Sequence, residues 1–418
     1  MDILFLSQIV PYPPHGGVLQ RGYNLIREIV KCHRIHLLAF RHPETLPTRE
    51  RVEESLRELK KHCATVEYVD MWPKKSPLHL SACLGCGLLL KSPFSAIAHR
   101  SVAFRKKVRN VLASRPIDLI HVDTIALAQY ADLGNGLPKV LTHHNIESKL
   151  MARRAAHENS RISRYYIGLQ ADRLSAYELE WCRKFDVNIF MSQIDALEMK
   201  REIPDLMTSV IPNGVDVDYF RPSTTLDGPP SLIYTGGMNM FANRDAVLYF
   251  LKEMWKPIRE EIPDISFCIV GQDPPGELLE MSKRDPNIRV TGYVDDVRSF
   301  ISQASIYVVP LRVGGGTRLK VLDAMAMGKA LVSTSVGCEG IEVTPGTDIL
   351  VENTPVAFAR AVIELLRNRA KREEMGRRAR ELAESRYSWV GIGKKLNDVY
   401  EETVSEKYNP AMGNEQES

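Results

Sequence analysis

Short apolar runs rich in β-branched residues alternate with longer stretches of helical periodicity along most of the chain. In the first half these runs are at 3–6, 35–40, 119–122, 140–142 and 187–190, and in the second half at 232–235, 267–270, 288–290, 306–309, 330–332 and 349–351. Strands that alternate with helices form parallel sheets covered by helices. Because two such series follow one another, the sequence predicts an α/β fold with two doubly wound, Rossmann-like domains.

A segment with turn and linker chemistry separates the two series. Pro212, Asn213 and Gly214 give a turn signal, and residues 222–230 are polar and rich in proline. We therefore expect a first domain over residues 1–205 and a second over 206–386. A helix over 387–405 is expected to cross back to the first domain, and the polar residues 406–418 to form a disordered tail.

Composition limits the class of protein. With 44% hydrophobic and 26% charged residues the chain has ordinary globular composition. It has no apolar stretch of membrane-spanning length and no start typical of a secretory signal, so we expect a cytoplasmic location. Seven mostly scattered cysteines indicate reduced thiols, and the single close pair, Cys83 and Cys86, is interpreted as packing because nothing nearby completes a metal site.

Charge is distributed unevenly along the chain. Residues 1–210 contain 30 Lys and Arg against 22 Asp and Glu, and residues 211–418 contain 25 against 30, which gives +8 followed by −5. The apolar segment 77–90 is too short to cross a membrane but could form an interfacial helix. Peripheral docking on the anionic inner face of the cytoplasmic membrane is one hypothesis, and a solvated basic surface is the simpler alternative. No nucleic-acid partner is indicated.

The segment from Val308 to Gly328 has the pattern strand, glycine turn, helix and closing glycine. Gly315 and Gly316, followed by Thr317, allow close approach of a ligand to the backbone. The free N–H groups and the positive dipole end of the following helix favour an anion. The sequence therefore predicts a phosphate site at this turn.

Lys320 and Asp323 are three residues apart and so lie on one face of the predicted helix. The cation could neutralise a diphosphate while the carboxylate accepts the ribose hydroxyl groups of the same nucleotide. An ordinary surface ion pair is the alternative, and it would be worth only tenths of a kcal/mol. The glycines ahead of the helix favour the nucleotide site.

Loops at other strand ends are expected to complete the site. Gly16 and Gly17 follow the first strand and could line the site near donor phosphates or acceptor, although a plain turn fits equally well. In the second domain the candidates are Gly236, Gly237, Tyr293 and Val294. His144 follows the strand at 140–142 and is favoured over His121, which also ends a strand.

The segment GGGTRLKVLDAMAMGKALVSTSVGCEG, together with TGGMNMFANRDAV, VDVDYF, GYVDDV and HNIES, resembles the retaining glycosyltransferases of family four with the B-type fold, GT-B. More narrowly, it is similar to bacterial exopolysaccharide sugar transferases of the exosortase-associated kind. The resemblance covers nearly the whole chain to about Tyr400. It implies two Rossmann-like domains that face each other across a cleft, with the nucleotide sugar held mostly by the second.

The resemblance also implies a hexosyltransferase-type activity. A sugar would move from a nucleotide-diphosphate donor to a glycan or polyprenyl-linked acceptor with retention, without a metal or other cofactor, in exopolysaccharide or cell-envelope biosynthesis. His144 would lie beside the transferred sugar as a catalytic residue. Arg318, Lys320 and the glycine-turn N–H groups would stabilise the leaving diphosphate.

The chain departs from the family pattern at several positions. Gly315 stands where the family usually has a glutamate that contacts the transferred sugar, and Asp323 replaces a second glutamate. Gly237 and Asn243 stand where an arginine and a lysine are usual, so Arg318 and Lys320 are expected to be the substitute cations. A nucleotide-sugar epimerase or hydrolase of the same fold, or a non-catalytic nucleotide-sugar-binding partner, remain alternatives.

The Asp-x-Asp sequence at 216–218 matches the metal-binding pattern of a different transferase architecture. It falls in the expected interdomain turn, away from a nucleotide loop. The glycines at 16–22 lack dinucleotide-binding spacing, and the 314–320 turn lacks the Lys-Ser/Thr of a P-loop. Dehydrogenase and ATPase interpretations are therefore disfavoured.

Overall fold

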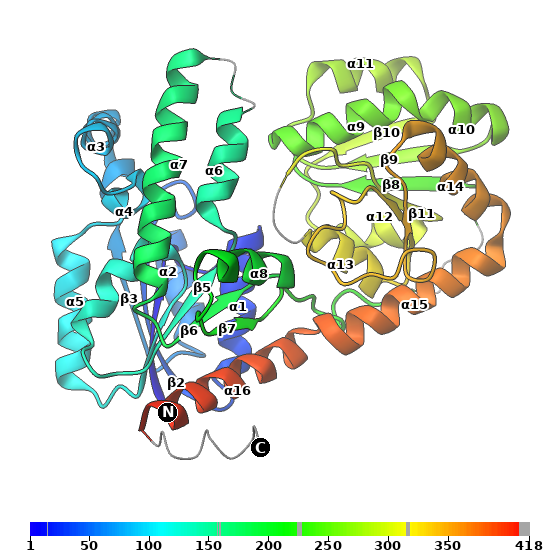
Figure 1. Cartoon of the computed structure of the whole chain (residues 1–418). Coiled ribbons are helices and arrows are strands. Elements are labelled where there is room, and N and C mark those ends of the chain that lie inside the picture. Colours follow the sequence, from blue (N-terminus) through cyan, green and yellow to red (C-terminus); the bar gives the residue numbers. More distant parts are fainter. Residues whose placement is uncertain (15, 157, 159, 224–227, 315–317, 409–418) are drawn as a thin grey trace. The chain divides into compact units, whose positions relative to one another are not determined.

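The computed structural model describes residues 1–14, 16–156, 158, 160–223, 228–314 and 318–408 (Figure 1). The chain divides into two compact units. The N-terminal unit comprises Met1–Pro212 and the segment from Ile392 onward, and the C-terminal unit comprises Asn213–Gly391. Each unit contains one parallel sheet with helices, as the sequence predicted.

Among the described residues, the N-terminal unit has a seven-stranded parallel sheet in the order β3-β2-β1-β4-β5-β6-β7. Its strands are β1 (Asp2–Ser7), β2 (Arg34–Arg41), β3 (Thr65–Asp70), β4 (Leu119–Val122), β5 (Lys139–His143), β6 (Val187–Phe190) and β7 (Thr208–Val210). Its helices are α1 (Gly17–Ile29), α2 (Arg49–Leu59), η1 (Trp72–Lys75), α3 (Pro77–Leu89), α4 (Phe94–Ala98), α5 (Val102–Ser114), η2 (Ile125–Leu133), α6 (Glu147–Ala156), α7 (Arg161–Cys182) and α8 (Gln193–Glu202).

The C-terminal unit repeats this plan with a six-stranded parallel sheet in the order β10-β9-β8-β11-β12-β13. Its strands are β8 (Ser231–Thr235), β9 (Ser266–Val270), β10 (Ile288–Gly292), β11 (Ile306–Val309), β12 (Ala330–Ser333) and β13 (Leu350–Val351). Its helices are α9 (Phe241–Glu253), α10 (Trp255–Glu261), α11 (Gly276–Arg284), α12 (Arg298–Gln303), α13 (Leu319–Ala326), α14 (Pro355–Arg367) and α15 (Arg369–Tyr387).

The central strands are apolar on both faces because helices cover both sides of a doubly wound sheet. In β1 the residues from Ile3 to Leu6 are fully buried, and so are all four residues of β11. In the N-terminal unit the rings of Phe40 and Phe104 stack with centroids 4.4 Å apart. These continuous apolar runs are the feature from which the sequence analysis predicted the strands.

In each sheet the chain order reverses direction between two central strands. The reversal lies between β1 and β4 in the N-terminal unit and between β8 and β11 in the C-terminal unit. Loops at the carboxyl ends of strands diverge at such a point, and doubly wound folds bind ligands there. The residues that follow these four strands are therefore candidates for a ligand-binding site.

Strand β7 pairs with β6, with Asn188 opposite Thr208 and Phe190 opposite Val210. The pairing makes β7 part of the N-terminal sheet. The division between units therefore falls after Pro212, later than the position after residue 205 expected from the sequence.

The last helix, α16, runs from Trp389 to Tyr408, and from Ile392 onward it belongs to the N-terminal unit. The hydroxyl of Tyr400 on this helix lies 2.5 Å from Nδ1 of His121 at the end of β4. Residues 406–408 are helical, so the expectation of a tail from residue 406 is wrong for them, and the remaining tail lies outside the described residues. In the described part of the chain, no helix is both long and apolar enough to cross a membrane.

Candidate functional site

A hydrogen-bonded network joins α13 to the loop that follows β8. The ammonium of Lys320 donates to the Tyr234 hydroxyl over 2.9 Å and to Asn243 Oδ1 over 2.7 Å. It also lies 4.2 Å from the centre of the Tyr234 ring. The Asn243 amide donates in turn to the carbonyl of Gly237 over 2.9 Å. Lys320 is therefore held at the carboxyl ends of β8 and β11, where the sheet changes direction.

The glycines in this loop are required by close packing. A Cβ at Gly236 would lie 2.5 Å from Lys320 Nζ, and the Gly236 φ of +150° is one that residues with side chains rarely adopt. Gly271, after β9, is tighter still, because its Cβ would lie 1.9 Å from the Gly236 carbonyl oxygen. The predicted residue Gly236 thus lies beside the Lys320 ammonium, and Gly237 is linked to it through Asn243.

Burial perturbs both charged groups on the inner face of α13. It lowers the pKa of Lys320 to about 7, the Arg318 guanidinium acts in the same direction, and Asp323 opposes the shift. Burial raises the pKa of Asp323 to about 8, opposed by Lys320. An ionised Asp323 and a charged Lys320 each favour the other, and a bound anion would further favour the charged form of Lys320.

Arg318 is the residue that caps the N-terminus of α13. Its guanidinium packs against Gly314, where a Cβ would lie 2.4 Å from Nη2 and where φ is +137°. Burial lowers the pKa of Arg318, and Glu339 opposes the shift. The helix start therefore carries the two cations expected for an anion site.

The other predicted residues of the C-terminal unit differ in placement. Gly315, Gly316 and Thr317 lie outside the described residues. Tyr293 is exposed directly after β10, and Val294 packs partly against the core of the unit. The structure brings Lys320 to Gly236 and, through Asn243, to Gly237, and among the described residues no hydrogen bond joins Tyr293 to this network.

In the N-terminal unit, Gly16 caps α1 with a φ of +95°, and a Cβ there would meet no atom within 4 Å. Gly17 begins the helix and is exposed. The first turn of α1 contains no acidic residue and receives no side-chain cap. This helix start can accept an anion, as expected from sequence, and an open turn is equally compatible with it.

His144 follows β5 and faces a buried carboxylate at the neighbouring strand end. Its Nε2 lies 3.5 Å from Oδ1 of Asp123, which follows β4 and is 1% exposed. Next to this pair, Thr124 donates to Oε1 of Glu147 over 3.0 Å. Burial raises the pKa of Glu147, and the hydrogen bond from Thr124 and the proximity of His144 oppose the shift. A cluster of polar groups thus gathers where the N-terminal sheet changes direction.

The neighbouring histidines have structural roles. His143 stacks on Phe190 with ring centres 4.6 Å apart, and its Nε2 lies 3.1 Å from Asn188 Oδ1. His121 stacks on Phe5 and contacts Tyr400. Burial lowers the pKa of both histidines to about 4, so both are neutral near pH 7. Of the three, His144 is the one with a ring nitrogen within 4 Å of a carboxylate oxygen.

The sequence analysis did not predict Tyr234 or Asp123 as site residues. It noted Asn243 only as a position where the family usually has a cation. Asp123 had a usable signal, because it is the first residue after an apolar strand, where His121 was considered instead. Tyr234 had none, since a tyrosine inside a buried strand is ordinary core. Asn243 places the Lys320 cation through a contact between residues 77 positions apart.

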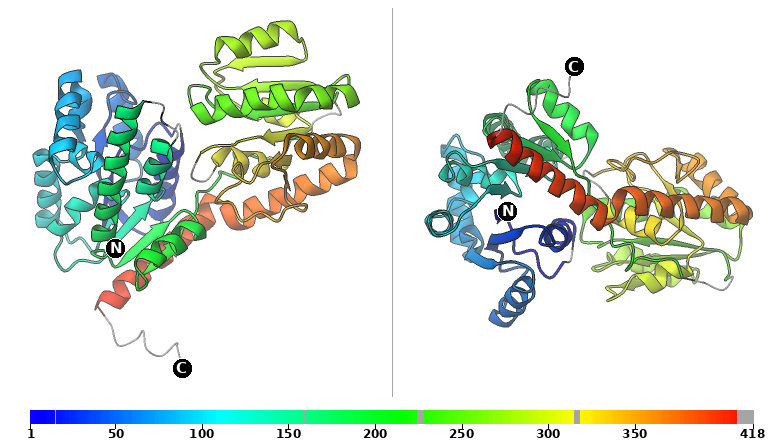
Figure 2. Two further views of the ribbon diagram at one scale, coloured as in Figure 1. Left: turned by 45° about the horizontal axis from the view of Figure 1, so that its top comes forward. Right: turned by 90° about the horizontal axis from the view of Figure 1, so that it is seen from below.

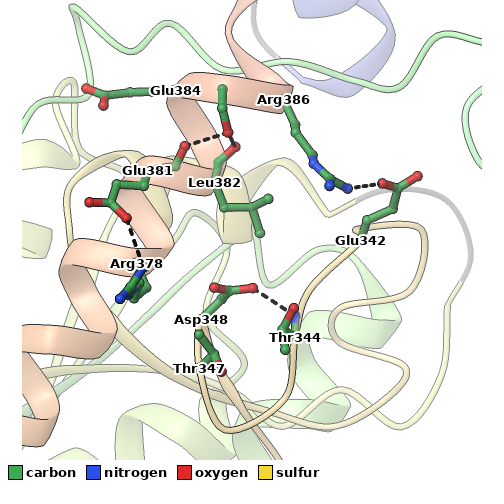
Figure 3. A pocket seen from close by; sticks show the side chains of 10 residues that line it. Glu342, Thr344, Thr347, Asp348, Arg378, Glu381, Leu382, Glu384 and Arg386 are labelled. Atoms are coloured by element: carbon green, nitrogen blue, oxygen red, sulfur yellow. Dashed lines mark hydrogen bonds and ion pairs between the residues drawn. The ribbon is translucent and has the colours of Figure 1, made fainter.

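A separate hollow of about 690 Å³ in the C-terminal unit contains no predicted site residue (Figure 3). It lies between the loop at 342–348 and α15. Its two arginines are paired with carboxylates, Arg386 with Glu342 at 2.5 Å and Arg378 with Glu381 at 3.7 Å. These pairs neutralise its cations, so we assign it no function.

Comparison with family models identifies both units. Residues 15–219 match the model described as Glycosyltransferase Family 4, and residues 229–368 match Glycosyl transferases group 1. The two matches cover most of the chain without overlapping.

Curated relatives match over shorter segments. A phosphatidyl-myo-inositol mannosyltransferase of Mycobacterium tuberculosis is 29% identical over 204 residues, 46% of this chain and 53% of the relative. A GDP-mannose-dependent monoacylated α-(1-6)-phosphatidylinositol monomannoside mannosyltransferase of Corynebacterium glutamicum is 27% identical over 209 residues, 45% of this chain and 55% of the relative. The matches therefore span about half the length of these relatives.

Solved structures resemble the whole chain. Sucrose-phosphate synthase from Thermosynechococcus elongatus has a TM-score of 0.67 at 17% identity, over 96% of this chain and 99% of that one. Anabaena HepE in complex with UDP and glucose has a TM-score of 0.64 at 15% identity, over 96% and 99%. At such identities the likeness shows the fold alone, which is the two-domain B-type glycosyltransferase fold expected from the sequence.

Proposed function

Since this chain belongs to the glycosyltransferases of the family four type, we propose that it transfers a sugar from a nucleotide-diphosphate donor, with retention and without a metal. The observation that carries the proposal is the placement of Lys320 at the carboxyl ends of β8 and β11, with Asp323 one helical turn further on. This arrangement provides a cation for a diphosphate and a carboxylate for a ribose.

In the proposed reaction, the bond between the sugar and the diphosphate breaks, and the acceptor oxygen bonds to the same face of the sugar. The acceptor proton passes to the departing diphosphate. Lys320 and Arg318 stabilise the negative charge that develops on this leaving group, and such preorganised electrostatics supply a large share of catalysis. Asp323 accepts the ribose hydroxyl groups.

We assign His144 to the sugar that is transferred. A histidine held beside the buried carboxylate of Asp123 can stabilise positive charge on a sugar as its bond to the diphosphate breaks. The nearby Glu147 is a second acidic group at the same strand edge. The assignment predicts that His144 affects turnover more than nucleotide binding.

A glycan or polyprenyl-linked acceptor is the acceptor class that we propose, in exopolysaccharide or cell-envelope biosynthesis. Two relatives act, by their names, on phosphatidylinositol-based lipids, and one depends by name on GDP-mannose. The HepE structure contains UDP and glucose. These names support a nucleotide-sugar donor and an acceptor that carries a lipid.

A nucleotide panel followed by a turnover assay tests the proposal. Titration with uridine, guanosine and thymidine diphosphates should give saturable binding and a rise in unfolding temperature that follows ligand concentration. The matching nucleotide sugar should then release nucleotide only when acceptor is present, and EDTA should leave the rate unchanged. Free sugar without acceptor would indicate a hydrolase, a rearranged donor an epimerase, and binding without turnover a binding partner.

A further inference from the structure

Helix α3 is apolar on every side, yet much of it is exposed. Its sequence, PLHLSACLGCGLL, contains no Asp, Glu, Lys or Arg. Only Cys83 and Gly87 of the helix are buried among its described side chains. The exposed leucines of the helix and of the residue after it are Leu78, Leu80, Leu84, Leu88, Leu89 and Leu90, and His79, Ser81 and Ala82 are exposed with them.

Contacts from α7 fix the position of this helix on the N-terminal unit (Figures 1 and 2). Gln170 donates to the Gly87 carbonyl over 2.6 Å, and Arg173 donates to the Leu88 carbonyl over 3.1 Å. Tyr166 contacts the Leu84 carbonyl over 3.4 Å. The carbonyl groups at the end of α3 are therefore satisfied by polar side chains, while its leucines are left uncovered.

The first turn of α7 also exposes apolar side chains. Ile162 is 84% exposed and Tyr165 is also exposed. A helix that is apolar all round is ordinarily buried in a core or a membrane. At about 1.5 Å per residue α3 is roughly 20 Å long, shorter than the roughly 30 Å hydrocarbon layer. It has the dimensions of a helix that lies along a membrane surface.

The segment that contains α3 carries charge of one sign. Residues 71–117 contain nine Lys and Arg and no Asp or Glu. Lys91 and Arg100, which follow α3, are exposed, and so are Arg161 and Arg164 beside Ile162 on α7. Arg173 does not join them, because it donates to the Leu88 carbonyl at the end of α3.

We propose that α3 and the first turn of α7 form a membrane-docking face that inserts leucines into the headgroup boundary of an anionic bilayer. Exposed leucines supply apolar area and the surrounding cations supply attraction to anionic lipid. A second copy of the chain fits less well, since pairing α3 with itself would bring two basic segments together. This proposal goes beyond sugar transfer and does not depend on it.

Vesicle flotation tests the proposal directly. The full chain is mixed with vesicles of phosphatidylcholine alone or with phosphatidylglycerol added, at 0.1 M and at 1 M salt. The chain should float with the anionic vesicles at 0.1 M salt and much less with neutral ones. Binding should fall at 1 M salt, because the screening length shortens from about 10 Å to about 3 Å.

Paired serine variants separate α3 from apolar surface in general. Leu88→Ser with Leu89→Ser should weaken binding to anionic vesicles by tenfold or more. The matched control is Ile194→Ser with Leu197→Ser, two exposed apolar residues on α8 of the same unit, which should bind like the parent. Unchanged unfolding temperature and nucleotide affinity would show that both double variants remain folded.

A charge variant tests the second half of the proposal. Lys91→Glu with Arg161→Glu should reduce the preference for anionic over neutral vesicles while leaving α3 apolar. Brominated lipid should quench the fluorescence of Trp72, whose ring centre lies 6.3 Å from that of His79 on α3, and Trp72→Phe should remove this quenching.

Three results would overturn the membrane assignment. These are absence of binding to anionic vesicles, undiminished binding by the double serine variant of α3, and a concentration-dependent dimer that this variant abolishes. The last result would assign the leucines to a second copy of the chain.

Discussion

Lys320 is the residue on which the proposed donor site depends most. Its ammonium is held by Tyr234 and Asn243, and it lies beside Gly236. Two of its three donors are thereby used by described residues of the protein, and the proposal assigns the third to the donor phosphate. Fixing the cation before the donor arrives reduces the entropy lost on binding.

Replacing Lys320 with Ala should weaken nucleoside diphosphate binding by about 1.5–3 kcal/mol, roughly tenfold to a hundredfold, because a charge-assisted phosphate contact is lost. Lys329→Met is the matched control. Its ammonium is also largely buried but donates to the carbonyls of Ser302 and Ala304. The control should lower the unfolding temperature and leave affinity intact, and equal affinities for all three chains would refute the phosphate role.

Donor affinity should also depend on pH through Lys320. With its pKa lowered to about 7 by burial, Lys320 loses its proton as pH rises through neutrality, and the phosphate must restore it. Affinity should therefore fall between pH 7 and pH 9, with proton uptake on binding, measured by calorimetry in buffers of different ionisation enthalpy. Ionisation of Asp323 has the opposite effect on affinity, because the carboxylate that accepts the ribose hydroxyl groups forms as pH rises. Asp323→Asn should therefore steepen the fall in affinity, and Lys320→Arg should flatten it.

Asn243→Ala should misplace Lys320 without removing its charge. The variant loses the acceptor for the ammonium and the donor to the Gly237 carbonyl. We expect about tenfold weaker nucleotide binding, measured by calorimetry, since one such hydrogen bond to a charged group contributes about 1.5–3 kcal/mol. Parent-like affinity would show that Lys320 needs no support from Asn243.

At the scale of secondary structure, the site depends on loops packed too closely for side chains. Gly271→Ala would place a methyl group 1.9 Å from the Gly236 carbonyl oxygen, so either β9 or the loop after β8 must move. The variant should lower the unfolding temperature and nucleotide affinity together. Gly276→Ala is the control, because its Cβ meets nothing within 4 Å at the start of α11, and it should change neither.

The strands that could be predicted from the sequence are those with continuous apolar runs. β1 and β11, buried on both faces, were located to within a residue or two, whereas β3 was missed because its sequence, TVEYVD, is only half buried at the sheet edge. β7 was missed because it has three residues. An edge strand carries less apolar signal, because fewer of its residues must leave water.

Within the site, the sequence predicted which residues carry charge and which face of the helix they share. It did not predict which side chains from other elements contact them. Lys320 and Asp323 could be placed on one side of a helix because α-helical spacing is local. The partners Tyr234 and Asn243 come from another strand and helix, and nothing local in the sequence indicates such a pairing. For the same reason the approach of Asp123 to His144 required the sheet order.

At the scale of the whole molecule, Tyr400 joins the last helix to the first sheet. Tyr400→Phe removes a buried hydrogen bond and leaves His121 Nδ1 without it, which should cost about 1–3 kcal/mol of stability. Calorimetric unfolding should show a destabilised chain with unchanged nucleotide affinity, since Lys320 lies in the other unit. Tyr408→Phe, an exposed position on the same helix, should have no effect, and a parent-like transition for Tyr400→Phe would contradict the anchoring role.

Because α16 completes the N-terminal unit, the ribosome synthesises that unit as two separate segments of the chain. The strands to β7 emerge first, and Tyr400 follows 188 residues after Pro212. At about 5–20 residues per second this interval is roughly 10–40 s. During this interval the C-terminal unit is synthesised and can fold, and His121 lacks its hydrogen-bond partner Tyr400. The first domain to be translated is therefore the last to be finished, and a ribosome stalled before residue 400 would hold a nascent chain in need of chaperone protection.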